Sequence, residues 1–158
     1  MSCGVALAVS LLLSDPAVAA AAAQPPAEAG APVSVAGEPL FADIVARSGE
    51  LHGLVRGWLT DGAAEQADFA AGGEYAAFRS RATELAALDM QGHLILKERG
   101  TDGDLKCILR GIAEDMPKRL EAVESAGSAT ERRVALDELA YLLNDNVEVI
   151  TAPPQPPV

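Results

Sequence analysis

Hydrophobic residues recur at helical spacing through four successive segments of the chain. At ~100° per residue, each set falls on one side of a helix. The first set is Phe41, Ile44, Val45, Leu51, Leu54, Val55, Trp58 and Leu59, and the second is Tyr75, Phe78, Ala82, Leu85, Ala86 and Leu96. The third is Leu105, Ile108, Leu109, Ile112, Met116, Leu120 and Val123, and the fourth is Leu136, Leu139, Ala140, Leu143, Val147 and Ile150. The pattern predicts four amphipathic helices.

Residues at the segment boundaries favour the same division. Pro39 suits a first helical position, which needs no amide hydrogen, and Thr60-Asp61-Gly62 ends the first helix. The second helix is expected over about residues 74–98, followed by a third from near Asp102. Ser128 and Glu131 have the spacing of a capping box, so a fourth helix is expected to begin there.

The expected fold is therefore all-α, an antiparallel up-down-up-down four-helix bundle over residues 38–150. Composition agrees, because aromatic residues make up only 4% of the chain and no alternating β-branched run occurs. Pro117 lies inside the third hydrophobic pattern, and its missing backbone donor predicts a kink there.

The two ends of the chain have different compositions from the helical part. Residues 1–23 contain a short apolar run followed by small residues, which is the pattern of an export signal. Residues 24–37 are rich in Pro, Ala and Gly and are expected to form a flexible linker, and 151–158 form a Pro-rich tail. The mature protein is therefore expected to be periplasmic or secreted.

The chain is acidic, with a formal net charge of −11. Residues 38–158 hold all 12 basic and 21 of the 23 acidic side chains, a net charge of −9. This sign argues against nucleic acid and against anionic membrane surfaces, both of which need basic patches. No membrane span is expected after signal removal, because the apolar run is too short to cross a bilayer.

The histidine content restricts the enzyme classes that the chain could belong to. His52 and His93 are the two histidines, and the sequence has no His-Glu-x-x-His, no glycine-rich phosphate loop and no Gly-x-Ser-x-Gly. His52 falls at the edge of the first hydrophobic stripe and is expected to be a half-exposed packing residue. No catalytic set is evident, so we expect a protein that is not an enzyme.

Asp89 and His93 both project onto the apolar side of the second helix. Residues four apart lie about one turn from each other, so the carboxylate and the imidazole can touch. One interpretation is a buried polar pair that fixes helix register. The other is a divalent metal site, because imidazole and carboxylate on one helix face suit such an ion if other helices add ligands.

The segment "LRGIAEDMPKRLEAVESAGSATERRVALDELAYLL", residues 109–143, resembles a helix pair of the b562-type cytochromes. In that family a Met and a His bind a b-type heme within a periplasmic four-helix bundle that transfers electrons. The resemblance implies Met116 as one heme ligand. The fourth helix has no histidine at the family's position, so His93 would have to supply the second ligand from a permuted helix.

Cys107 is the one cysteine that remains after signal removal, and it projects away from the third stripe. A homodimer joined through Cys107 is therefore possible, as is an unpaired thiol. The sequence as a whole predicts an exported acidic helical bundle of the cell envelope with a binding or accessory role. The two alternatives are a b-type heme electron carrier and a divalent metal-binding bundle.

Overall fold

The computed structural model describes residues 34–100 and 103–152, and within them the chain is all-helical. The four long helices are α2 (Pro39–Asp61), α3 (Gly73–Arg99), α4 (Gly103–Ser125) and α5 (Ala129–Thr151). Two short 3-10 turns, η2 (Ala63–Glu65) and η3 (Phe69–Ala71), connect α2 to α3. The prediction of an all-α fold with four helices is confirmed, and the described residues contain no strand.

Local sequence accounts for the ends of the helices. Pro39 occupies the first turn of α2, as predicted, and Gly62 ends that helix with φ at 81°. Gly100 ends α3 with φ at 64°, in the left-handed region that glycine adopts most easily. The Oγ of Ser128 accepts a hydrogen bond from the amide of Glu131 at 3.2 Å, which confirms the predicted cap of α5.

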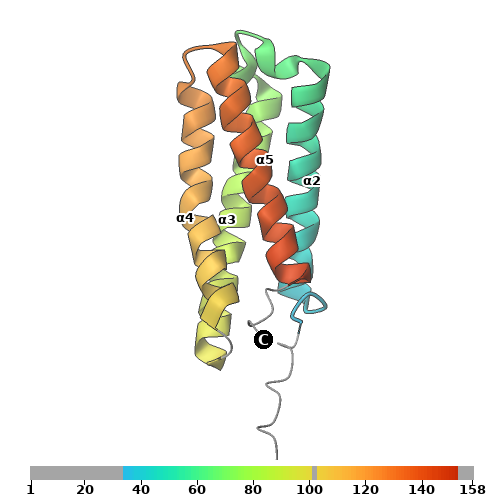
Figure 1. Ribbon diagram of the computed structural model, residues 1–158, viewed down its shortest axis with the longest axis vertical. Coiled ribbons are helices and arrows are strands. Elements are labelled where there is room, and N and C mark those ends of the chain that lie inside the picture. Colours follow the sequence, from blue (N-terminus) through green and yellow to red (C-terminus); the bar gives the residue numbers. More distant parts are fainter. Residues whose placement is uncertain (1–33, 101–102, 153–158) are drawn as a thin grey trace, which may run out of the picture. The chain divides into compact units, whose positions relative to one another are not determined.

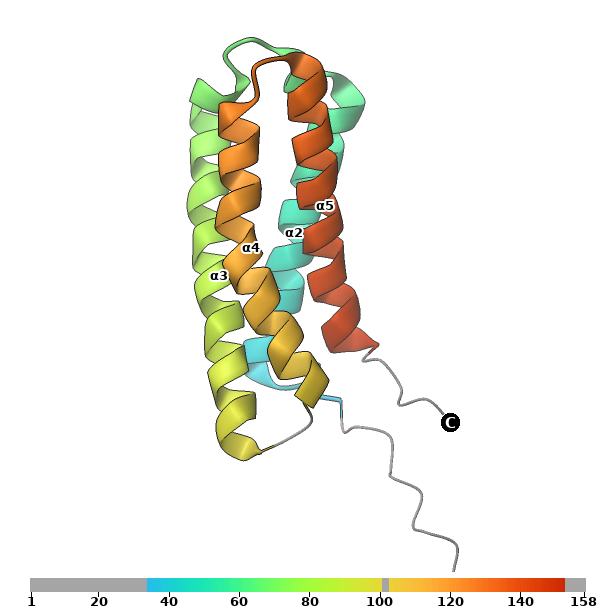
Figure 2. The same ribbon diagram turned by 60° about the vertical axis from the view of Figure 1, so that its left-hand side comes forward.

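The four helices lie side by side (Figures 1 and 2), and α4 continues through Pro117 to Ser125. Helices α2 and α4 both pack against α5, and both also pack against α3. Their apolar sides form one core, whose largest fully buried side chains are Tyr75, Phe41, Phe78, Ile44, Leu51, Leu85, Leu109, Met116, Leu136, Leu139, Leu143 and Ile150. The hydrophobic stripes of the sequence therefore predicted the core well.

Four of the chain's six aromatic residues gather at one end of this core. The Trp58 ring meets Phe69 and Phe78 edge-on, with centroids 5.1 and 5.0 Å apart, and Phe69 lies 5.4 Å from Tyr75. The hydroxyl of Tyr75 donates to the Leu120 carbonyl at 3.1 Å. Burial of the phenol raises the pKa of Tyr75 well above its ordinary value, so it remains a donor.

The connection between α2 and α3 is held by the first turns of α5. Arg132 is buried, and its Nη1 donates to the carbonyls of Ala64 at 3.0 Å and Gln66 at 2.6 Å. Its guanidinium also lies 5.9 Å from the centre of the Phe69 ring. Arg133 Nη1 donates to the Leu59 carbonyl in the last turn of α2 at 3.1 Å and lies 3.4 Å from Glu65 Oε1 of η2, so two arginines of α5 contact this connection.

None of the described helices combines the length and the hydropathy that crossing a membrane requires. The predicted signal (1–23), most of the predicted linker (24–37) and most of the predicted tail (151–158) lie outside the described residues. Within the helical part, the predicted bounds agree with the observed ones to within a few residues.

Candidate functional site

Three polar side chains from three helices meet in the middle of the apolar core. Ser48 of α2, Asp89 of α3 and Asn146 of α5 each have 0% of their surface exposed. Burying polar groups costs free energy unless they bond to one another, so such a cluster is the strongest candidate for a functional site. We call these three residues the buried polar layer.

The helical pattern that builds the core also points these residues inward. Ser48 follows Ile44 by four positions, and Asn146 follows Leu143 by three, so each lies within the apolar stripe of its helix. Asp89 follows Leu85 by four positions. All three stripes face the same core. The buried polar layer therefore consists of polar residues at three positions where the helical pattern would otherwise place apolar ones.

The amide of Asn146 joins the layer together. Its Nδ2 lies 3.0 Å from Ser48 Oγ, 3.0 Å from Asp89 Oδ1 and 3.1 Å from Asp89 Oδ2, and it donates to all three oxygens. The Oδ1 of Asn146 has no hydrogen-bond partner among the described residues. The carboxylate thus receives hydrogen bonds from one nitrogen alone, which is a weak compensation for a buried charge.

This environment changes the acidity of Asp89. Burial raises the pKa of its carboxyl to about 7, and the hydrogen bond from Asn146 offsets part of that rise. No charged side chain contributes to the shift. Asp89 therefore holds a proton up to near-neutral pH, and its neutral carboxyl can donate a hydrogen bond as well as accept one.

Helical spacing allows Asp89 and His93 to touch, but in the described chain each forms its hydrogen bonds with another helix. Both side chains point inward as expected, with His93 9% exposed, but Asp89 bonds to Asn146. His93 Nδ1 lies 2.7 Å from the Lys106 carbonyl oxygen of α4. Because a carbonyl only accepts, Nδ1 of His93 carries a proton and donates this hydrogen bond. The physical reason is that each group finds a better-placed partner on another helix.

The same hydrogen bond shows why Met116 and His93 do not fit one heme. Lys106 lies level with His93, and Met116 lies ten residues farther along α4. At ~1.5 Å per residue this places Met116 about 15 Å away along the helix axis. Both axial ligands of a heme must reach a single iron atom. Met116 is instead fully buried among core side chains.

The other candidate residues are placed as follows. His52 is half-buried on α2, and Cys107 is exposed on α4 as a free cysteine, as the helical projections predicted. Among residues 34–100 and 103–152, no group of three or more His, Cys, Asp or Glu side chains is arranged to hold a metal ion. A metal site at Asp89 and His93 therefore lacks further ligands of these types in the described part of the chain.

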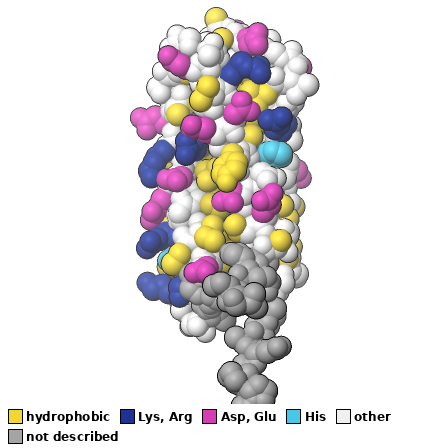
Figure 3. All heavy atoms as spheres, viewed as in Figure 1, with side chains coloured by type: hydrophobic (Ala, Val, Ile, Leu, Met, Phe, Trp, Pro, Cys, Tyr) yellow, Lys and Arg dark blue, Asp and Glu magenta, His cyan; other side chains and the backbone are white. Residues whose placement is uncertain are grey.

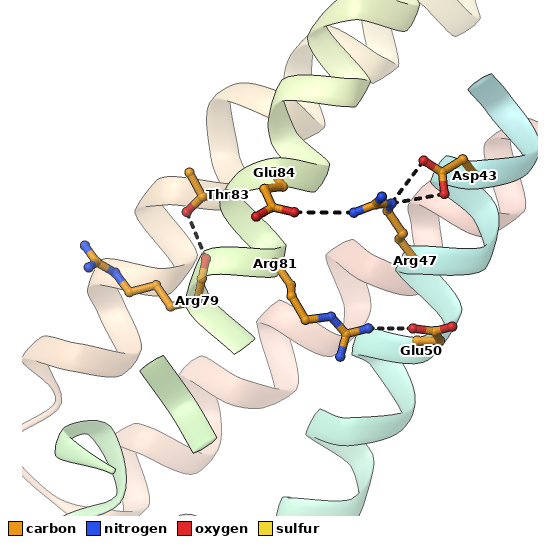
Figure 4. Close-up of polar contacts among 7 residues, drawn as sticks. All are labelled: Asp43, Arg47, Glu50, Arg79, Arg81, Thr83 and Glu84. Atoms are coloured by element: carbon orange, nitrogen blue, oxygen red, sulfur yellow. Dashed lines mark hydrogen bonds and ion pairs between the residues drawn. The ribbon is translucent and has the colours of Figure 1, made fainter. Parts of the chain in front are cut away.

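A groove between α2 and α3 holds the clearest group of charged side chains (Figure 4). Arg47 lies between Asp43 at 3.0 Å and Glu84 at 3.4 Å, and Arg81 pairs with Glu50. These side chains are 40–68% exposed, so the pairs contribute little to stability. Each arginine already has a carboxylate partner. The ion pairs of this groove are best explained as links between α2 and α3.

Sequence reasoning identified Asp89 but missed Ser48, Asn146 and Arg132. A signal was present for Asn146, because it lies three residues after Leu143 and four before Ile150 on an otherwise apolar stripe. Ser48 lies in the same way between Ile44 and Leu51. Neither residue is unusual on a helix, and only the packing of three helices brings them to Asp89.

The buried polar layer draws its residues from distant parts of the chain. Asn146 and Asp89 are 57 positions apart in sequence, and Ser48 is 98 positions from Asn146. No short motif can therefore define the layer. No protein-family model, curated protein or solved structure matches the chain.

Proposed function

We propose that this chain is an exported, acidic four-helix bundle that acts as a binding or accessory protein of the cell envelope and is not an enzyme. Its helices would run up-down-up-down with antiparallel neighbours. Two bonds support that order for α3 and α4, since Tyr75 pairs with Leu120 and His93 with Lys106. Residue numbers therefore rise along one helix as they fall along the other.

The burial of the polar layer is the observation that carries the proposal. Asp89 and His93 are the inward groups best suited to acid–base chemistry, and they are 0% and 9% exposed. Asp89 bonds to Asn146, and His93 Nδ1 bonds to a backbone carbonyl. A substrate would have to displace close-packed core side chains to reach Asp89, so recognition is better placed on the outer surface.

Cell fractionation tests the location. The full chain, carrying a tag at its carboxyl end, is expected in the periplasm or the medium, with a mass that shows removal of residues 1–23. A variant with charged residues placed in the apolar run should stay in the cytoplasm at full length. Full-length parent protein that stays in the cytoplasm would contradict the export part of the proposal.

A panel of hydrolase, transferase and redox assays tests the absence of catalysis. Purified parent protein and Asp89→Asn are compared at acidic and mildly basic pH, with circular dichroism to establish that both are folded. We expect no turnover that depends on Asp89. Turnover that the folded variant loses would overturn the non-enzymatic assignment.

A further inference from the structure

The outward side of α5 exposes two large hydrophobic side chains. Val134 is 54% exposed and Tyr141 is 73% exposed, and they lie seven residues apart on the same side of the helix, ~10 Å from each other. Leu94 of α3 is the one other large hydrophobic residue of the described chain with comparable exposure. Two of three such residues therefore belong to one face.

Acidic side chains surround these two residues. They are Asp137, Glu138, Asp145 and Glu148, which project to the same outward side at helical spacing. No Lys or Arg follows Arg133 on α5. Figure 3 shows hydrophobic side chains down the middle of this face with acidic ones beside them, while basic side chains lie toward its upper part and edges. We call Val134, Tyr141 and these four residues the acidic α5 face.

Neighbouring helices neutralise only the first half of this face. Asp137 lies 3.3 Å from Arg56 of α2, and Glu138 pairs with Arg119 of α4. Both cations come from helices beside α5.

The second half of the face lacks such compensation. Glu148 accepts a hydrogen bond from Asn144 at 2.7 Å, and Asp145 has no ion-pair partner among the described residues. Both carboxylates lie in the last two turns of α5, where the helix dipole is negative and no basic residue is present. Negative charge at that end is unfavourable unless a cation is supplied.

We propose that the acidic α5 face docks a cationic, partly apolar segment of another protein. Lys or Arg side chains of the partner would pair with Asp145 and Glu148, and apolar or guanidinium groups would cover the Tyr141 ring. This surface rests on the binding role proposed above and specifies the charge of the partner. The charges also disfavour other occupants, since a second copy of this chain, a nucleic acid or an anionic membrane would bring negative charge to a negative face.

Calorimetric titration of the full mature chain with a synthetic amphipathic Lys/Leu peptide tests the surface. We expect binding that weakens as salt is raised. Tyr141→Ser and the double variant Asp145→Asn/Glu148→Gln should each weaken binding by about tenfold or more. The matched control is Glu74→Gln/Glu98→Gln, which removes the same charge from exposed positions of α3 and should leave binding within about threefold of the parent.

The outcomes separate the surface from the broader proposal. Equal weakening by the two double variants, or no effect of Tyr141→Ser, would mean general attraction to an acidic protein and would reject the surface. Absence of binding would reject it as well, as would a dimer in sedimentation that Tyr141→Ser dissociates. The envelope location is tested separately by fractionation, and these binding results do not affect it.

Discussion

Asp89 is a buried carboxyl whose one hydrogen-bonding partner in the described part of the chain is the Asn146 amide. Its inward direction follows from helical spacing alone, which is why the sequence could identify it. The identity of its partner could not be predicted, because Asn146 comes from another helix and meets Asp89 only once rotation and register of both helices are fixed. Helical spacing also suggested a pair between His93 and Asp89. Spacing within one helix cannot reveal a competing partner on another helix, and the partner of His93 is on α4.

The raised pKa of Asp89 predicts that the free energy of unfolding decreases as the pH rises. The folded protein holds this proton up to about pH 7, whereas the unfolded chain releases it near 3.8. Between these values the folded state binds more protons, so raising the pH favours unfolding at up to ~1.4 kcal/mol per pH unit. Urea unfolding from pH 4 to 8 should show this slope in the parent and lose it in Asp89→Asn.

Asp68→Asn is the matched control for that measurement, because it makes the same Asp-to-Asn substitution at an exposed position outside the long helices. The free energy of unfolding of this variant should depend on pH in the same way as that of the parent. If the free energy of unfolding changed with pH equally in the parent and in Asp89→Asn, the assignment of a raised pKa to Asp89 would be wrong.

Asn146→Leu should destabilise the protein more at pH 8 than at pH 5. The substitution removes the donor that supports the Asp89 carboxylate, so the carboxyl stays protonated at pH 8, where the parent gains up to ~1.4 kcal/mol from releasing that proton one unit above its pKa of about 7. At pH 5 the carboxyl is neutral and the cost is smaller. Ser48→Ala, which leaves the donor in place, should cost less at pH 8, and equal losses for Asn146→Leu at the two pH values would refute the explanation.

At the scale of the elements, the helices were predictable because their signals are local. Pro39, Gly62, Gly100 and the Ser128 cap all act within a few residues of a helix end. The distances between helices were not predictable in this way. Gly92 lies on the buried side of α3 where α2 and α4 come close, and its place four residues before Leu96 predicts the inward direction but not how close those helices are.

Gly92→Ala should therefore destabilise the bundle. A Cβ at this position would lie 3.2 Å from Leu109 Cδ1 and 3.2 Å from Phe41 Cε1, so these two buried side chains would have to shift by a few tenths of an ångström within a packed core. We expect a loss of about 1–3 kcal/mol in thermal or urea unfolding. Gly53→Ala is the matched control, because a Cβ there meets nothing within 4 Å and alanine favours the helix by ~0.5–1 kcal/mol. If Gly92→Ala and Gly53→Ala both stabilised the protein, the close approach of Leu109 and Phe41 to Gly92 would be contradicted.

At the scale of the molecule, the resemblance to heme-binding bundles is testable directly. Met116 lies well away from the level of His93, so one heme iron cannot take both as ligands. Hemin added to the purified chain should therefore not produce the spectrum of a low-spin iron with Met and His ligands. Such a spectrum, lost in Met116→Leu and His93→Gln but kept in His52→Gln, would show that α3 and α4 have a different register in solution.

Helix α5 completes contacts with segments that lie far earlier in the sequence. Arg132 fixes the connection between α2 and α3, and Asn146 satisfies Asp89 of α3. During synthesis the first three helices leave the ribosome without either contact, because both depend on α5. Folding of the bundle therefore cannot finish until α5 has been synthesised, and until then the first three helices stay accessible to partners that bind unfolded chains.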